Sequence, residues 1–394
     1  MFMKLELPRY TERFGSVKIH DIQRVLLLDS SEDSPPHSAS VCSIPRSRIE
    51  EIERRMAIVI PVKNEKLKVL EGVISAIPSE CLIIIVSNSR RNKVDRFRME
   101  YEMVEQYVYY TKRAVWMIHQ KDAGVGSAVR KIGYEDLLDE KGLVHDGKAE
   151  GMILGMLLAK ASGKDYVGFI DADNYIPGAV HEYVKIYSAA FCLAQSPYVM
   201  VRISWAYKPK ILEGSLYFSK WGRVSKITNK YLNKLITSFT GFETEVVKTG
   251  NSGEHAMTMK LAELLDYSSR FAIETGEIIN ILEQFGGVLD PKFYEPMEKG
   301  VEIFQIETRN PHFHEEKGDE HIREMLFDSL LTIVSSPLCP DSLRSEIFEK
   351  YPDMAKSRSS ASRRVIRSFI NVDVKSFLDS LISSNSIIML GRST

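Results

Sequence analysis

Cysteine is scarce in this chain, and its four residues, Cys42, Cys81, Cys192 and Cys339, are widely separated. No C-x-x-C pair occurs, which argues against a zinc–cysteine site and against a disulfide framework. Long apolar runs are missing too, since stretches such as 152–159 fall far short of the ~20 residues that a membrane helix needs. The opening residues, MFMKLELPRYTERF, contain no apolar signal core. These absences predict a soluble cytoplasmic protein with no membrane association.

An excess of charge of either sign is also missing. The 394 residues include 52 Lys and Arg against 53 Asp and Glu, which gives a formal net charge of −1. This balance predicts no nucleic-acid partner and no attraction to an anionic membrane. The hydrophobic content of 44% is enough for a sizeable core, and the length suggests two domains.

Strand-like and helical patterns alternate through the first half of the chain. Two helical patterns, Lys66–Ile77 and Glu150–Lys160, lie between short apolar runs that are typical of strands buried on both faces. Those runs are Met56–Val62, Cys81–Ser87, Ala114–His119 and Tyr166–Ile170. The alternation predicts an α/β fold with a doubly wound, mostly parallel sheet, in which ligands bind at the carboxyl ends of the strands.

The pattern changes after about Val201, where aromatic, alternating and basic segments predict antiparallel strands and loops. A polar stretch at 29–40 predicts a loop, and the Ser/Arg-rich stretch 356–364 predicts an exposed linker before a short helical end. Three further helices are predicted, over Glu254–Leu265, Gly276–Phe285 and Asp319–Ser335. We therefore divide the chain into an N-terminal extension (1–50), an α/β domain (51–205) and an α+β region that becomes helical towards the C-terminus (206–394).

The apolar run YVGFI ends on two acids, Asp171 and Asp173. If extended backbone persists to Asn174, both carboxylates project to one side of the strand. Two carboxylates at the exit of a buried strand suit Mg²⁺ or Mn²⁺. The alternative is an Asp-x-Asp in a solvated turn, and the motif alone leaves both interpretations open.

Polar residues also follow the other predicted strands. Ordinary turn chemistry explains any one of these ends. Together with the strand that ends on the two acids, however, four strands end on polar residues, which favours a shared ligand such as a base and its ribose. The residues concerned are Pro61, Val62, Lys63, Asn64 and Glu65 after the first strand, Ser87 and Asn88 after the second, and Gln120, Lys121 and Asp122 after the third.

Three further features carry candidate chemistry. In HDGKAEG, Lys148 lies near a helix N-terminus, where amide dipoles, a flexible backbone and a cation together suit a diphosphate. In NPHFH, either His312 or His314 could complete a metal shell begun by Asp173, or both could lie in an exposed loop. Glu254, after a glycine-rich stretch, could orient an acceptor hydroxyl or merely favour a helix N-terminus.

Together these motifs resemble the mannosyl-3-phosphoglycerate synthases. The resemblance rests on IPVKNE, IIVSNS, GKAEGM, FIDADNYIPGAV, WGRVSKITN, TGNSGEHAMTMKLAE and ETRNPHFHEEKG, and it extends from LPRYTERF to about Ser335. It implies a GT-A-type fold with a nucleotide-sugar-binding domain at 51–205 and an acceptor-binding region after it. It also implies metal-dependent, retaining transfer of mannose from GDP-mannose to 3-phosphoglycerate, a step toward the compatible solute mannosylglycerate, by a cytoplasmic homodimer.

The resemblance also implies roles for particular residues. The polar strand-end residues named above would hold guanosine, Lys148 the diphosphate, and Asp171 with Ala172 the nucleotide sugar. Asp173 and one histidine, for which we favour His312, would bind Mg²⁺ or Mn²⁺. Glu254 would align the acceptor or the mannose. The acceptor itself would contact Gly222, Arg223, Ser225 and Asn251, with the planar guanidinium of Arg223 suited to a phosphate.

Three alternatives remain at this point. A sugar nucleotidyltransferase would use a similar sheet and metal, but it needs a glycine-rich NTP signature near the N-terminus, which is absent here. A glucosyl-3-phosphoglycerate synthase would use another donor with the same acceptor. A non-catalytic nucleotide-binding regulator would bind without turnover, and the retention of both acids, Lys148, Arg223 and Glu254 argues against it.

Overall fold

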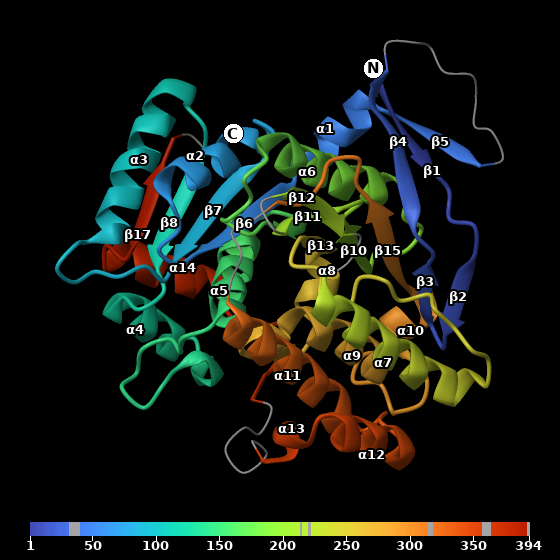
Figure 1. Ribbon diagram of the computed structural model, residues 1–394. Helices are drawn as coiled ribbons and strands as arrows, with labels where there is room; N and C mark the ends of the chain where they lie inside the picture. The colour runs from blue at the N-terminus through green and yellow to red at the C-terminus, as the bar shows by residue number, and fades with distance from the viewer. Residues whose placement is uncertain (31–39, 213–214, 220–221, 314–317, 357–363, 392–394) are drawn as a thin grey trace.

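A large twisted sheet crosses the molecule, and helices cover both of its faces (Figure 1). The computed structural model describes residues 1–30, 40–212, 215–219, 222–313, 318–356 and 364–391. The 13 strands of this sheet are β1 (Phe2–Glu6), β2 (Thr11–Phe14), β3 (Val17–His20), β4 (Gln23–Ser30), β5 (Val41–Pro45), β6 (Met56–Val62), β7 (Leu82–Ser87), β8 (Val115–His119), β9 (Tyr166–Phe169), β10 (Val199–Ser204), β13 (His255–Thr258), β15 (Val301–Glu307) and β17 (Ile387–Leu390).

The four strands predicted from apolar runs form the parallel centre of the sheet, in the order β8-β7-β6-β9. Both faces are covered, so the pattern in these strands is continuous rather than alternating; β7 is buried at every position. The chain runs outward from β6 to β8 and then returns to place β9 on the other side of β6. In such sheets, ligands bind beyond the carboxyl ends of the strands at the point where the order reverses. That point lies between β6 and β9.

The helices form two layers, each packed on its own hydrophobic cluster, so the doubly wound α/β prediction is confirmed. One face carries α1 (Arg46–Arg54), α2 (Leu67–Ala76), α3 (Arg96–Thr111) and α6 (Pro177–Leu193). The other carries α4 (Ala123–Lys131), α5 (Lys148–Ala161), α7 (Arg223–Thr240), α8 (Met259–Ala262), α9 (Ile273–Phe285), α11 (Asp319–Ser335), α12 (Asp341–Lys350) and α14 (Val374–Ser383).

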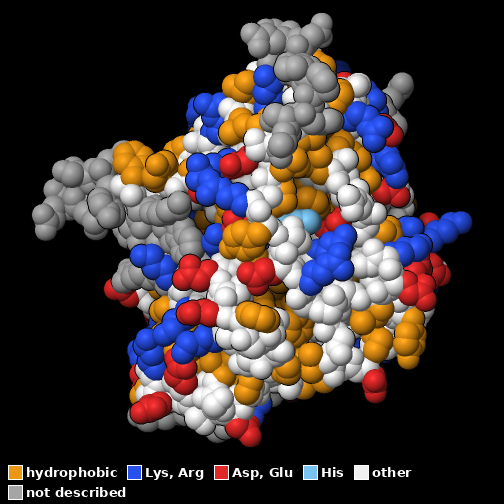
Figure 2. All heavy atoms as spheres, turned by 90° about the vertical axis from the view of Figure 1, so that its right-hand side faces the viewer, with side chains coloured by type: hydrophobic (Ala, Val, Ile, Leu, Met, Phe, Trp, Pro, Cys, Tyr) orange, Lys and Arg blue, Asp and Glu red, His pale blue; other side chains and the backbone are white. Residues whose placement is uncertain are grey.

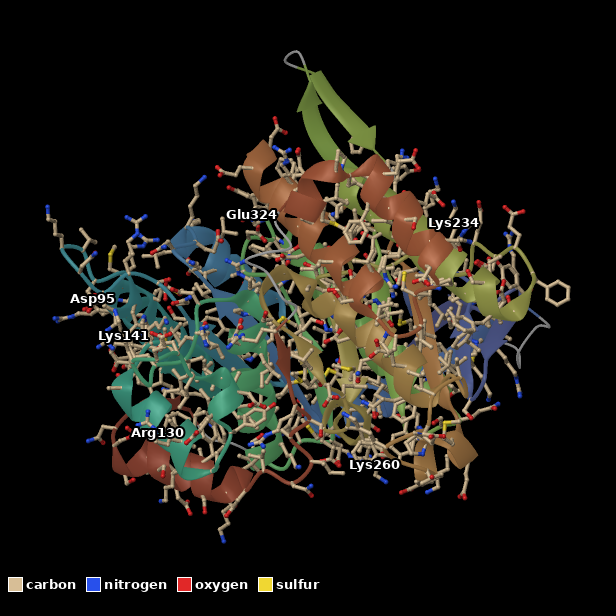
Figure 3. All side chains as sticks on the ribbon, turned by 90° about the horizontal axis from the view of Figure 1, so that it is seen from below. Asp95, Arg130, Lys141, Lys234, Lys260 and Glu324 are labelled. Carbon is tan, nitrogen blue, oxygen red and sulfur yellow. The ribbon has the colours of Figure 1, made fainter. Side chains whose placement is uncertain are left out.

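Shorter elements lie outside these layers. The antiparallel hairpin of β11 (Lys208–Leu212) and β12 (Ser215–Ser219) stands away from the rest of the ribbon (Figure 3). The remaining elements are β14 (Tyr267–Ser268), which pairs with β16 (Val365–Ile366), the helices α10 (Glu295–Lys299) and α13 (Pro352–Lys356), and 3₁₀ turns at Glu135–Leu137 and Arg270–Ala272. Most of the predicted loop and linker, 31–39 and 357–363, lies outside the described residues.

One predicted helix is wrong. Residues His255–Thr258, inside the predicted helix Glu254–Leu265, form β13, which pairs antiparallel with both β9 and β10. Only the short α8 follows it. The gap between two strands supplies partners for this segment on both sides, and such tertiary pairing outweighs local helical preference. In contrast, α11 has the predicted bounds, and α9 begins three residues before the predicted Gly276.

Both ends of the chain extend the same sheet. Strands β4, β1 and β5 continue it beyond β15, and β17 pairs antiparallel with β8 at the opposite edge. The C-terminal end, predicted to be helical, is therefore a helix followed by an edge strand, with α14 packed beside α4 (Figure 3). A single sheet thus runs through all three segments into which we divided the sequence.

The surface agrees with the balanced composition. Figure 2 shows Lys and Arg side chains interspersed with Asp and Glu over the face that carries the N-terminal strands. Within the described part of the chain, no helix combines the length and the apolar character required to cross a bilayer.

Candidate active site

The two acids of the Asp-x-Asp motif lie just beyond β9, in a turn rather than on extended backbone. Strand β9 ends at Phe169, and Asn174 Nδ2 donates a 2.8 Å hydrogen bond to the carbonyl of Asp171. The expected extended backbone as far as Asn174 is therefore wrong, because this side-chain bond gives the chain an alternative to the strand ladder. The turn buries Asp173 and leaves Asp171 half-buried.

Lys148 joins the motif through ion pairs. It begins α5 directly after Gly147, which confirms its predicted place at a helix N-terminus. Its Nζ lies 2.6 Å from Asp171 Oδ1 and 2.9 Å from Glu274 Oε1. Burial disfavours the ammonium charge, but the two carboxylates outweigh burial and hold the pKa of Lys148 well above its usual value.

Sequence reasoning missed Glu274. This residue lies in the first turn of α9, and 126 positions separate it from Lys148. Its only local signal is an acid near a helix N-terminus, which is common because the helix dipole favours it. The pairing is visible only once the fold brings the N-terminal turns of α5 and α9 together.

Gly253 lets a second loop approach this ion cluster. A Cβ at this position would lie 2.7 Å from Asp171 Oδ2 and 3.3 Å from Lys148 Nζ. The first distance is shorter than any ordinary contact, so a side chain here would displace the Asp171 carboxylate. The glycine therefore allows the backbone of 249–254 to lie directly against the acid–lysine pair.

Glu254, the next residue, is fully buried beside the same turn. Its Oε1 accepts a 3.0 Å hydrogen bond from Asn174 Nδ2, and its Oε2 has no hydrogen-bond partner among the described residues. Burial, with the negative charge of Asp171 second, raises the pKa of Glu254 to about 8. Glu254 precedes β13, so the interpretation of this acid as a helix N-terminal residue is wrong.

We expect this raised pKa to make the stability of the metal-free protein depend on pH. In the unfolded chain Glu254 loses its proton near its ordinary pKa of ~4.3, but in the folded protein it does so at about 8. The native state therefore loses stability as pH rises through this window. Glu254→Gln should raise the melting temperature by an amount that is near zero at pH 4.5 and increases toward pH 8. Scanning calorimetry of the wild type and the variant in the presence of a chelator, over this pH range, checks this. A difference in melting temperature that does not change with pH contradicts it.

His312 lies next to the motif turn. The Tyr175 amide donates a 2.9 Å bond to the Phe313 carbonyl, which ties the turn to the NPHFH segment. The buried imidazole stacks on Trp205 with ring centroids 4.4 Å apart. Its Nδ1 lies 3.3 Å from the Tyr183 hydroxyl and 4.0 Å from Glu254 Oε1. The other candidate, His314, lies outside the described residues.

The donor set near this turn combines carboxylate oxygens, which suit Mg²⁺ or Mn²⁺, with one imidazole nitrogen. Asp173 and His312 come from segments that the Tyr175–Phe313 hydrogen bond holds together. Across the ranges that the structure describes, however, no three His, Cys, Asp or Glu side chains are grouped closely enough to hold a metal ion. These two residues could supply two ligands to a metal ion and would leave its other coordination positions open.

The 249–254 loop also borders a small pocket. Side chains and backbone from β10, the start of α7 and the loop line it: Ile203, Ser204, Trp205, Gly222, Ser225, Lys248, Thr249, Asn251 and Ser252. Three of the four residues predicted to bind the acceptor, Gly222, Ser225 and Asn251, therefore line one cavity. Lys208 Nζ stacks over the Trp205 ring at 3.8 Å and adds a cation near the pocket.

The GRVS motif forms a helix N-terminus. Gly222 is the N-cap of α7, and Arg223 is its first residue. A helix N-terminus presents unpaired backbone amides and the positive end of the dipole, which favour an anion. The Arg223 side chain itself lies outside the described part of the structure.

The three predicted strand ends meet at one edge of the sheet. The Asn88 amide donates to the Val62 carbonyl (2.8 Å), and the Gln120 amide donates to the Ser87 carbonyl (2.7 Å). Asn64 has a positive φ of 60°, and its amide donates to Ser89 Oγ at 2.7 Å. This unusual conformation folds the end of β6 against the end of β7. The strand ends are thus brought together as predicted.

Several of these side chains already have protein partners. Ser87 Oγ donates to buried Glu100 at 2.7 Å, and Gln120 Nε2 donates to the His145 carbonyl at 2.6 Å. Asp122 caps α4 by accepting from the Gly124 amide.

The remaining donor-site candidates differ in exposure. Lys63 is exposed, Pro61 and Glu65 are half-buried, and Ala172 is buried. The ammonium of Lys121 lies 3.3 Å from Asp139 Oδ2. Glu100, which sequence reasoning missed, holds the β7 end.

Comparison with known proteins decides the family. The sequence model of the mannosyl-3-phosphoglycerate synthases matches residues 7–381. The chain belongs to this family. The synthase from Pyrococcus furiosus is 47% identical over 393 residues, which cover 98% of this chain and 99% of the relative. The mannosyl-3-phosphoglycerate synthase from Aeropyrum pernix is 40% identical and covers 88% of this chain and 89% of its own. The resemblance seen in the motifs is thus confirmed.

A solved structure is also similar. It is glucosyl-3-phosphoglycerate synthase from Mycobacterium tuberculosis in complex with Mn²⁺, uridine-diphosphate and phosphoglyceric acid. The TM-score is 0.48 at 16% identity, and the match covers 79% of this chain and 86% of that chain.

Proposed function

We propose that this chain transfers mannose from GDP-mannose to 3-phosphoglycerate with retention of the anomeric configuration, giving mannosyl-3-phosphoglycerate. Membership of the synthase family supports the reaction class. The observation that carries the proposal is the position of one loop. Gly253 lies against the Lys148–Asp171 pair, while Thr249, Asn251 and Ser252 line the pocket. A donor at the ion pair and an acceptor in the pocket would both contact this one short loop.

The donor site is at the reversal of the strand order. The polar ends of β6, β7 and β8 hold guanosine and ribose, Asp171 and Ala172 contact the nucleotide sugar, and Lys148 binds the diphosphate. The α5 N-terminus adds its dipole to the charge of Lys148 at that position. An incoming diphosphate competes with Asp171 for the ammonium, and Glu274 remains on its other side.

The metal site consists of Asp173 and His312, with substrate phosphate oxygens completing it. We assign His312 rather than His314 because the hydrogen bond between Tyr175 and Phe313 holds it beside the motif turn. When bound, Mg²⁺ or Mn²⁺ would supply positive charge to the leaving diphosphate. The stacking of the imidazole on Trp205 and its Nδ1 contact with Tyr183 restrict how the ring can turn.

The chemical step is a displacement on one face of the sugar. The acceptor hydroxyl oxygen bonds to the anomeric carbon as the bond between that carbon and the diphosphate oxygen breaks. GDP keeps the electron pair, and the hydroxyl proton passes to a leaving phosphate oxygen. Lys148 stabilises the charge that develops on GDP. Glu254, which is buried beside the motif turn, aligns the acceptor or the mannose.

The acceptor site is the pocket. The α7 N-terminus at Gly222, with the Ser225 hydroxyl and the Arg223 guanidinium, binds the phosphate. Lys208, which lies over the Trp205 ring at the border of the pocket, favours the second anionic group of 3-phosphoglycerate. Lys248 also lines the pocket, but its ammonium pairs with Asp21 at 2.7 Å. The family resemblance further supports a cytoplasmic homodimer, which light scattering on the purified protein tests for oligomeric state.

A donor-by-acceptor matrix tests the proposal. Purified protein with Mg²⁺ or Mn²⁺ is given GDP-mannose, GDP-glucose or UDP-glucose, each with 3-phosphoglycerate, glycerate or no acceptor, and released nucleotide is measured. We expect turnover with GDP-mannose and 3-phosphoglycerate and little without the phosphate. Preference for a glucose donor would make the chain a glucosyltransferase. A separate reaction contains GTP and mannose-1-phosphate, with released pyrophosphate as its readout. Turnover only in that reaction would favour the nucleotidyltransferase, and binding without turnover would favour a regulator.

A further inference from the structure

Asn251 is anchored in the pocket wall through its amide nitrogen. Its Nδ2 donates to Ser329 Oγ at 2.7 Å and to Thr275 Oγ1 at 3.2 Å. Thr275 lies in the first turn of α9 and Ser329 in the middle of α11, so two helices hold one side-chain amide. Both amide hydrogens of Asn251 are used in these bonds.

The two hydroxyls also determine which way round the amide lies. Thr275 Oγ1 donates its single proton to the Gly250 carbonyl at 3.0 Å. Ser329 Oγ donates its own to the Met325 carbonyl at 2.9 Å. Each hydroxyl can therefore only accept from Asn251, and the atom that faces them must be the NH₂ group. A flipped amide would put its oxygen against two acceptors.

These bonds leave the side-chain carbonyl oxygen of Asn251 without a hydrogen bond. Asn251 Oδ1 is buried and has no hydrogen-bond partner among the described residues. An unpartnered buried acceptor is unfavourable, and an incoming donor relieves it. Asn251 lines the pocket together with Gly222 and Ser225, so the group that would supply this donor is the acceptor substrate.

We propose that Asn251 Oδ1 accepts a hydrogen bond from the acceptor's hydroxyl, the group that attacks the sugar, and that Thr275 and Ser329 are positioning residues that present this oxygen. The inference rests on the proposed function. A carbonyl oxygen repels phosphate and carboxylate oxygens, and in 3-phosphoglycerate the hydroxyl is the hydrogen-bond donor that remains. Asn251 therefore recognises the attacking hydroxyl, while the α7 N-terminus binds the phosphate.

The test compares 3-phosphoglycerate with 3-phosphooxypropanoate, which keeps the phosphate and carboxylate but lacks the hydroxyl. Calorimetry with GDP and Mg²⁺ gives the affinity of each ligand for the full-length protein. We expect the wild type to prefer 3-phosphoglycerate by about tenfold, the size of one buried hydrogen bond. Asn251→Ala should bind both ligands equally.

Two further variants separate positioning from general disruption. Thr275→Val removes one anchor of the amide while keeping the shape of the side chain, and it should reduce the preference for the hydroxyl to about threefold. Ser225→Ala is the matched control in the same pocket. It should weaken both ligands by the same factor and leave the tenfold preference intact, because it acts on the phosphate.

The outcomes are distinguishable. A preference that persists in Asn251→Ala overturns the inference, as does a wild type that binds both ligands equally. Should Asn251→Ala fail to fold, the preference measured in Thr275→Val decides in the same way. If the wild type binds neither ligand, the proposed function fails and the inference with it. If Ser225→Ala changes neither affinity, only the phosphate assignment is wrong.

Discussion

Asp173→Ala should abolish mannosyl transfer, with a fall in kcat of roughly a thousandfold or more. The residue is buried in the turn after β9, on the segment that hydrogen-bonds to the loop carrying His312. A metal that neutralises a leaving diphosphate contributes several kcal/mol to the transition state, and each ~1.4 kcal/mol is tenfold in rate. Steady-state release of GDP over a titration of Mg²⁺ and Mn²⁺ measures the loss. The dependence of activity on added metal should disappear with it.

Asp165→Ala is the control for that variant. Asp165 precedes the other end of the same strand, and its exposed carboxylate pairs with Arg55 at 2.8 Å. An exposed pair of this kind contributes ~0–1 kcal/mol, so activity should stay close to that of the wild type. Near-native activity of Asp173→Ala at saturating Mg²⁺ would remove this residue from the metal site.

Lys148→Met should weaken GDP-mannose binding by about 10- to 150-fold, as expected for loss of a hydrogen bond to a charged group. It should also lower the free energy of unfolding by about 3 kcal/mol, because it leaves Asp171 and Glu274 without their cation. This value is the lower end of the range usual for breaking a buried ion pair, because the Asp171 side chain is 31% exposed and water can partly solvate its charge. Calorimetric titration and chemical denaturation measure the two effects separately.

Lys185→Met provides a matched control. Lys185 on α6 has the same exposed side-chain fraction as Lys148, 17%, and its Nζ lies 2.8 Å from the buried carboxylate of Glu53. This variant should lose stability to a similar degree and keep its affinity for GDP-mannose. An equal loss of donor affinity in both variants would show that unfolding, not the lost diphosphate contact, explains the result for Lys148→Met.

The parallel centre of the sheet was predictable because its signal is local. Continuous apolar runs separated by helix-length segments are read directly from neighbouring residues, and a parallel connection needs such a crossover. The start of α5 at Lys148 followed in the same way from the flanking glycine and the apolar helix. The helix predicted over 254–265 failed because β13 takes its conformation from β9 and β10, which lie far away in the sequence.

The sequence by itself determined the family and the α/β class of this protein, together with most of the polar residues at the strand ends. Only the tertiary structure decided which side chains act together. Glu274 reaches Lys148 across 126 positions, and Thr275 and Ser329 orient the amide of Asn251 from two separate helices. Ion pairs and hydrogen bonds act over a few ångströms whatever the separation along the chain. A one-dimensional pattern therefore shows each partner but not the pairing.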